Sequence, residues 1–327
     1  LLSGAYTPRH HVYAVGSTDR GPRELMRLTP VPNKSGLSPG VVTMADALKA
    51  AGYATAHVGK WHLGGPDGAE PRQQGFDVSF SLGDSKDLEM HDGVAGQATD
   101  PKAATQLTMK AVEFMAQHTQ EPFFVYLAHY AIHTPIESRK ETFDYYHAKP
   151  PGSYHTDARY AACTQDFDHS VGVLLASIKE LGLEDNTIVV FTSDNGALQG
   201  RSSQEPLRGN KGCYYEGGIR EPFIVRWPGV TQPGARCDVP VSQVDLYPTL
   251  LAAAGAAAPA GAVLDGTNLL PLLRGGALAR DAIFWHFPGY LDRPVLRGRD
   301  PVFRTRPVSA IRKGDWKLLL YHEEWLL

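Results

Sequence analysis

The sequence predicts an α/β protein: a three-layer α/β/α sandwich with a mostly parallel mixed sheet, followed by a small C-terminal antiparallel sheet. Two observations lead to this prediction. Apolar strand-like runs alternate with helical patterns up to about residue 275, which is typical of a parallel sheet covered by helices. From about residue 276, strand-like runs follow one another without helices between them. We therefore expect two units, residues 1–275 and residues 276–327.

Each expected strand is a short run of β-branched and aromatic residues bounded by turn residues. These runs are residues 53–58, 123–129, 187–192 and 223–227, and in the second unit residues 282–287, 310–312 and 316–321. Residues 187–192 carry no charge and predict a fully buried strand. Apolar residues at helical spacing predict helices over residues 44–51, 101–118, 156–181 and 245–254. We expect loops over residues 4–40, 64–98 and 136–156.

The composition is that of a soluble globular protein. The 327 residues are 43% hydrophobic and 20% charged, with a formal net charge of −3. This near-neutral charge argues against a general nucleic-acid or membrane-surface binder. There is no apolar run of about 18 residues or more, so we expect no membrane insertion. The three cysteines, Cys163, Cys213 and Cys237, form no metal-binding pattern, and we assign Cys163 to the apolar face of the 156–181 helix.

Both ends of the sequence are abrupt. Residues 1–4 open inside what looks like an apolar segment, without a Met or a targeting peptide, and residues 321–327 stop in mid-pattern. We therefore expect the sequence to be a fragment of a longer protein.

The run 187–192 ends in Ser193, Asp194, Asn195 and Gly196. Ligands of open α/β sheets bind beyond the carboxyl ends of the strands. A carboxylate beside a carboxamide at such an end offers oxygen ligands to a hard cation. The alternative is a simple turn, because Asp, Asn and Gly are common turn residues.

Titratable side chains also follow the other expected strands. Lys60 and His62 come directly after residues 53–58, and His133 follows residues 123–129, whereas His129 lies inside its apolar run and is more typical of a core or rim histidine. Lys211 lies between glycines in a loop. Singly, each could be a surface lysine or an incidental histidine. Together with a metal-binding pair they predict a site for a tetrahedral oxyanion, with histidines for proton transfer.

Several motifs resemble those of the sulfatases of the alkaline-phosphatase superfamily. Residues 52–64 (GYATAHVGKWHLG) resemble the second sulfatase signature, and residues 1–10 (LLSGAYTPRH) resemble the segment that follows the first signature, Cys/Ser-x-Pro-x-Arg. Further similar blocks are IHTP at 132–135, FTSDNG at 191–196, LRGNKG at 207–212, YEGGIR at 215–220, VDLYPTL at 244–250 and LDG at 264–266.

The resemblance implies that residues 1–275 are a sulfatase catalytic domain and that the protein is a sulfuric ester hydrolase. Asp194 and Asn195 match late ligands of Ca²⁺, or of Mg²⁺ in some relatives. Lys60 and Lys211 match the lysines that hold the sulfate oxygens. His62 matches a histidine that helps to eliminate sulfate, and His133 the residue that protonates the leaving alcohol. The implied nucleophile is a formylglycine, made from Cys or Ser by a formylglycine-generating or anaerobic maturation enzyme.

The sequence departs from the family pattern at its start. The nucleophile motif and the early Asp pair that supplies the other metal ligands are absent from the 327 residues, and no cysteine stands in a Cys-x-Pro-x-Arg pattern. We expect this polypeptide to be inactive and to bind metal poorly. Two alternatives stay open: a phosphodiesterase or phosphonate monoester hydrolase of the same superfamily, or a non-catalytic protein that binds sulfated glycans.

The substrate is less specified than the reaction. The loops 64–98, 136–156 and 287–309 are expected to form the pocket wall, with His286 and Arg293 as candidate substrate contacts. We expect a carbohydrate or aryl sulfate rather than a steroid or lipid sulfate, because the sequence shows no membrane-inserting hairpin. Sulfatases of this kind are usually exported, so we expect a periplasmic or extracellular protein.

Overall fold

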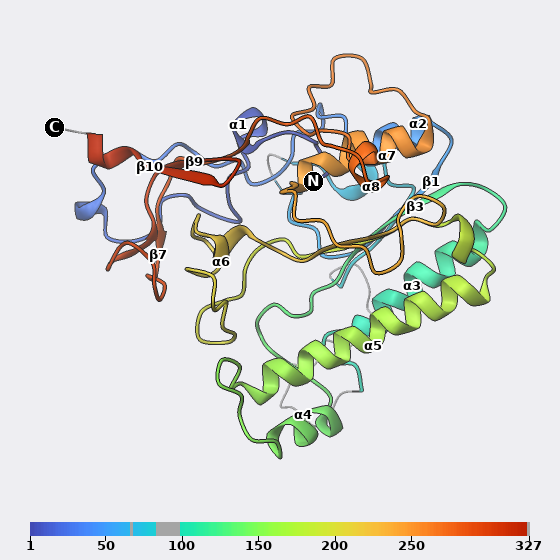
Figure 1. Cartoon of the computed structure of the whole chain (residues 1–327), viewed down its shortest axis with the longest axis horizontal. Helices are drawn as coiled ribbons and strands as arrows, with labels where there is room; N and C mark the ends of the chain where they lie inside the picture. The colour runs from blue at the N-terminus through green and yellow to red at the C-terminus, as the bar shows by residue number, and fades with distance from the viewer. Residues whose placement is uncertain (66–67, 83–98, 326–327) are drawn as a thin grey trace.

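The computed structural model describes residues 1–65, 68–82 and 99–325. Figure 1 shows three layers, with α2 and α7 on one side of strands β1 and β3 and the long helices α3 and α5 on the other. A small antiparallel sheet with β9 and β10 lies at the far end of the molecule. This arrangement confirms the predicted α/β sandwich with an antiparallel C-terminal sheet.

Among the described residues, the sandwich contains a parallel three-stranded sheet, β2-β1-β3, and a separate antiparallel pair, β4-β5. β1 (Ala54–Gly59) pairs in parallel with β2 (Val78–Phe80) and with β3 (Phe123–Ala128). β4 (Val189–Thr192) pairs with β5 (Phe223–Arg226), and these two strands are antiparallel. The carboxyl ends of β1 and β3 therefore lie side by side, with Gly59 opposite Ala128.

The helices cover the sheet through apolar contacts. α2 (Met44–Ala50) begins with a capping box between Thr43 and Asp46, and its Met44 packs with Tyr247 of α7 (Leu246–Ala254) in one buried cluster. On the other face, Leu107 of α3 packs against Val58 of β1. The remaining helices are α1 (Thr7–His10), α3 (Ala104–Gln117), α4 (Lys140–His147), α5 (Ala158–Glu180), α6 (Glu216–Ile219) and α8 (Leu270–Leu273).

Several sequence expectations need correction. The predicted loop 287–309 contains the short strands β7 (Leu291–Asp292) and β8 (Phe303–Thr305), which form by pairing with each other, and the predicted loop 4–40 contains the one-turn helix α1. The predicted loop 136–156 contains α4, which is held by the tertiary contact of Thr142 with Asp166 of α5. The predicted loop 64–98 contains the short strand β2, and residues 66–67 and 83–98 of that loop lie outside the described residues. α3 begins at Ala104 rather than at 101, because Ala103 has a left-handed backbone with φ 49°. The strand expected at 187–192 covers only Val189–Thr192.

That strand, β4, is also less buried than predicted. All four of its residues are partly exposed. The physical reason is its position: among the described strands β4 has one neighbour, β5, whereas a fully buried strand is paired on both edges.

The small sheet has the strand order β10-β9-β6, formed by Trp316–Tyr321, Val308–Lys313 and Ile283–Phe287. Two shorter strands, β7 (Leu291–Asp292) and β8 (Phe303–Thr305), form a second antiparallel pair. The N-terminal segment packs on this part of the chain, since Asp19 forms a bridge with Tyr290. The domain boundary near residue 275 stays a prediction. None of the described helices has the length and apolar character needed to cross a membrane.

Candidate active site

The end of β1 is tied to the end of β3, and this contact positions Lys60. The backbone N–H of Lys60 donates to the carbonyl of Ala128 over 2.7 Å. Gly59 is required there, because its φ is 111° and a Cβ atom would lie 2.0 Å from the Ala128 carbonyl oxygen. The segment after β1 is thus held against the segment after β3, which carries His133.

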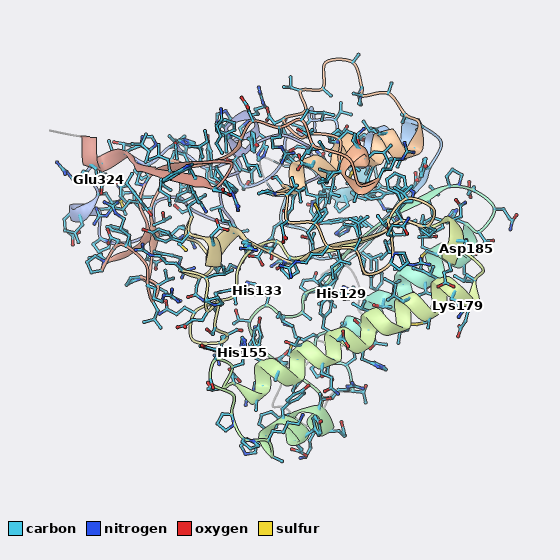
Figure 2. The ribbon with its side chains drawn as sticks, in the orientation of Figure 1. His129, His133, His155, Lys179, Asp185 and Glu324 are labelled. Atoms are coloured by element: carbon cyan, nitrogen blue, oxygen red, sulfur yellow. The ribbon has the colours of Figure 1, made fainter. Side chains whose placement is uncertain are left out.

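The two histidines after β3 have different surroundings. His129 packs edge-on against Phe167 of α5, with ring centroids 5.0 Å apart, and its Nε2 lies 3.1 Å from Thr108 Oγ1. Burial lowers the pKa of His129 to about 4. His129 therefore has packing and hydrogen-bond partners within the protein, as expected of a core or rim histidine. His133 lies farther along the same segment, away from α5 (Figure 2), and its exposed ring has Nδ1 2.7 Å from the Thr134 carbonyl.

The loop that carries Lys211 is tied to the end of β4. The N–H of Lys211 donates to the carbonyl of Ala197 over 3.0 Å, and the N–H of Gly196 donates to the carbonyl of Gly218 over 3.1 Å. Lys211 is therefore fixed next to Asp194 and Asn195.

The electrostatics show that four predicted residues lie together. Desolvation, followed by the charges of Lys60, His133 and Lys211, lowers the pKa of His62, while Asp194 opposes this shift. Desolvation also lowers the pKa of His133, where the Thr134 carbonyl opposes the effect and Lys60 and Lys211 add to it. We call Lys60, His62, His133 and Lys211 the basic rim. Neither lysine of this rim forms an ion pair with any described residue.

Two further cations near the basic rim were missed by the sequence reasoning. Lys102, whose Nζ donates to the Pro135 carbonyl over 3.0 Å, contributes to the low pKa of His133. Arg304 contributes to the low pKa of Lys211, after desolvation and Lys60 and against the opposing charge of Asp194. Both positions depend on tertiary packing. Lys102 lies in the first turn of the helix predicted over residues 101–118, and Arg304 is one of several arginines in the predicted loop 287–309, so no local pattern distinguishes either residue.

Asp194 and Asn195 offer oxygen atoms on adjacent residues, and their side chains make no hydrogen bond to any described residue. This donor set fits two ligands of a hard cation. No group of three or more His, Cys, Asp or Glu that could hold a metal ion occurs in the described ranges. Burial and the charge of Asp194 raise the pKa of the neighbouring Glu221 to about 7.

Asp194 and Asn195 also border a cavity of about 1670 Å³ that extends to the small sheet. His286 lines this cavity and its Nδ1 lies 2.8 Å from Ser309 Oγ, whereas the basic rim does not line it. Arg293 lies elsewhere, beside Arg304, whose Nε donates to the Arg293 carbonyl over 3.4 Å. The structure thus brings together the basic rim with Asp194 and Asn195, and of the two predicted substrate contacts only His286 lines the cavity.

Comparison with known proteins agrees with these motifs. The sulfatase family model matches residues 1–256, and a model of the C-terminal part of N-sulphoglucosamine sulphohydrolase matches residues 209–326. The chain is 34% identical to human arylsulfatase A over 87% of its length and 59% of that protein. It is 32% identical to mouse N-acetylgalactosamine-6-sulfatase over 98% of its length and 61% of that protein. The chain therefore spans about three fifths of these curated relatives.

Solved structures show the same fold. The structure of Ps i-CgsB in complex with k-i-k-neocarrahexaose aligns with a TM-score of 0.72 and 27% identity, over 98% of this chain and 72% of the other. A phosphonate monoester hydrolase from Silicibacter pomeroyi aligns with a TM-score of 0.68 and 19% identity, over 98% of this chain and 76% of the other. At this identity the likeness shows a shared fold only. Because the family model covers most of the chain and the fold agrees, this chain belongs to the sulfatase family.

Proposed function

We propose that the chain carries the sulfate-ester site of a sulfuric ester hydrolase, with the basic rim as its binding and proton-transfer groups. The observation that carries this proposal is the meeting of two lysines that form no ion pair with a described residue, together with two histidines, from three segments at the carboxyl ends of β1, β3 and β4. Holding like charges together is unfavourable without an anion. A sulfate group supplies the compensating charge.

The roles follow from charge and proton affinity. Lys60 and Lys211 hold the sulfate oxygens and neutralise the charge that develops on them in the transition state. His133 donates a proton to the departing alcohol oxygen, and its lowered pKa makes the protonated ring a stronger acid. His62, whose pKa is also lowered, is neutral at pH 7 and accepts a proton on the nucleophile side of the sulfur.

Asp194 and Asn195 are the proposed ligands of a divalent cation, Ca²⁺ or Mg²⁺. When bound, this ion supplies Lewis-acid polarisation of an ester oxygen, and the formylglycine implied by the family supplies the attacking oxygen. Neither group changes what the chain's own residues do, which is to bind the anion and to move protons. Modification by a formylglycine-generating or anaerobic maturation enzyme belongs to this proposal.

We propose a sulfated glycan as the substrate and export from the cytoplasm as the location. Support comes from relatives: one is named for a sulfated amino sugar, and another was solved with a carrahexaose. Sulfate is preferred over phosphate because the Lys60-Trp61-His62 and Gly209-Asn210-Lys211 blocks resemble those of sulfatases.

Calorimetric titration of 4-nitrophenyl sulfate and methyl 4-nitrophenyl phosphate, a phosphodiester with the same single negative charge, into the 327-residue polypeptide tests this proposal. The sulfate ester should stay uncleaved, because the sequence has no Cys/Ser-x-Pro-x-Arg motif, and it should bind saturably and more tightly than the phosphodiester. Tighter binding of the phosphodiester would favour the phosphodiesterase alternative. Measurable turnover of the sulfate ester would contradict the expected inactivity.

A further inference from the structure

Arg304 of β8 lies directly on the loop that carries Lys211. A Cβ atom placed on Gly212 would be 2.4 Å from Arg304 Cδ and 3.4 Å from its Nη1. Because Gly212 is the next residue after Lys211, the guanidinium lies beside the proposed sulfate site. Only glycine leaves room for this approach, and Gly212 also has φ 85°.

Two other arginines approach Arg304 from separate segments. The Nε of Arg304 donates to the backbone carbonyl of Arg293, 3.4 Å away, so these residues are neighbours. Arg20 comes from the N-terminal segment, where its N–H donates to the Tyr290 carbonyl over 3.2 Å. The following residue, Gly21, lies against the ring of Phe303, which precedes Arg304. The packing of three segments therefore gathers three arginines.

The negative charge near these arginines is small. Asp292 lies 3.7 Å from Arg293, and neither Arg20 nor Arg304 forms an ion pair with a described residue. The Nε of Arg20 is buried and has no hydrogen-bond partner among the described residues. Desolvation, followed by the charge of Arg20, lowers the pKa of Arg304 despite the opposing charge of Asp292.

Arg306, two residues farther along, shows the opposite situation. It forms ion pairs with Asp300 and with Glu323, the latter at 2.6 Å. Burial alone would lower the pKa of Arg306, but hydrogen bonds to these two carboxylates raise it. The same segment thus contains one arginine that is paired with carboxylates and one, partly buried, that forms no ion pair with a described residue, and removing a cation from water without an ion pair is costly.

We propose that Arg304, Arg293 and Arg20 form a second anion subsite beside Lys211, which binds a second sulfate or a carboxylate of the same glycan. We call these residues the arginine subsite. Guanidinium groups bind planar or tetrahedral oxyanions through paired hydrogen bonds. The inference rests on the proposed function, because it places the first sulfate on the basic rim. The substrate class becomes a polyanionic glycan with two anionic groups on the same or adjacent sugars.

The test is calorimetric binding of three probes to the 327-residue polypeptide. The probes are N-acetylgalactosamine 6-sulfate, N-acetylgalactosamine 4,6-disulfate and a chondroitin 6-sulfate disaccharide, which carries a carboxylate in place of the second sulfate. The second charge should increase affinity about tenfold, the value of one charge-assisted contact. The dianionic probe with the larger gain in affinity over the monosulfated sugar shows whether the second group is a sulfate or a carboxylate.

Arg304→Gln should remove most of this gain and lower the affinity for the monosulfated sugar by no more than about threefold. Arg304→Lys, which keeps the charge, should retain part of the affinity gain. It shows whether a loss in Arg304→Gln comes from the missing charge or from a folding defect. Arg72→Gln, an equal charge change at an exposed residue of the 3-10 turn Pro71–Gln74, should leave all three affinities unchanged.

Two results would overturn the inference. A full affinity gain in Arg304→Gln would show that the arginine subsite does not bind the second group. Equal losses for all probes would assign Arg304 to the first sulfate. If no form of the protein binds the monosulfated sugar, the sulfatase proposal itself fails, and the arginine subsite fails with it.

Discussion

Charged side chains in two regions of this protein differ in how their charge is compensated. In the basic rim, Lys60 and Lys211 have no carboxylate partner among the described residues. Near α7, Asp245 is fully buried and is paired with Arg280, whose side chain is 11% exposed. Asp245 also accepts hydrogen bonds from the backbone N–H groups of Ser242 and Thr267. The second region uses charge for stability, and the first leaves charge available to a ligand.

The largest effect is expected from breaking the compensated pair. Asp245→Asn should lower the free energy of unfolding by about 3–5 kcal/mol, because it leaves the Arg280 cation buried without a partner. Urea unfolding measures this change. Asp238→Asn is the matched control: it breaks an ion pair with Arg236 whose side chains are 83% and 79% exposed, and it should change stability by less than about 0.5 kcal/mol. Similar values for the two variants would contradict the comparison.

His129 makes the stability of the protein depend on pH. The pKa of His129 is about 4 in the folded protein against an ordinary value of 6.5, so the unfolded chain takes up a proton first as the pH falls. This residue alone should therefore reduce stability between about pH 6.5 and pH 4, by about 3 kcal/mol in total. His129→Gln should lose stability less steeply over this range in urea unfolding. An unchanged pH slope would show that His129 is not held neutral by burial.

A substitution in the basic rim should have the opposite effect to Asp245→Asn: it should weaken sulfate binding and leave stability nearly unchanged. Lys211→Ala should weaken sulfate binding by about 1.5–3 kcal/mol, while the free energy of unfolding should stay within about 0.5 kcal/mol of wild type or rise. The reason is that this lysine forms no ion pair with a described residue, and that burial and repulsion from Lys60 work against its attraction to Asp194. Calorimetry and urea unfolding of the same sample measure both quantities. A loss of stability as large as that of Asp245→Asn would contradict this assignment.

The smallest effect concerns the two rim histidines. Because desolvation and the lysines lower the pKa values of His62 and His133, both rings gain a proton only below their ordinary pKa. Each proton adds positive charge beside the sulfate, so sulfate affinity should rise by about threefold as the pH falls below 6. His62→Gln should reduce this rise, whereas His155→Gln should not, since His155 instead contacts Ser202.

Local sequence signals predict the strands of the sandwich and the residues that follow them. The runs around Val58 and Phe191 indicated strands, and the residues after them are those that the structure brings together. Signals from periodicity could not predict α4, which depends on Asp166 of another helix, or β2, which is too short to show alternation. The position of Arg304 depends on three segments far apart in the sequence, so no local pattern could indicate it. The chemical roles of the site residues stay predictions.

The central claim is that the uncompensated lysines of the basic rim form a sulfate site. The most direct measurement is the urea unfolding midpoint of wild type and of Lys60→Ala/Lys211→Ala, with inorganic sulfate and with chloride at equal ionic strength. Sulfate stabilises folded proteins in general, so the informative quantity is the difference between the two proteins: sulfate should raise the midpoint of wild type clearly more than that of the double variant. Equal stabilisation of both proteins by sulfate would contradict the claim.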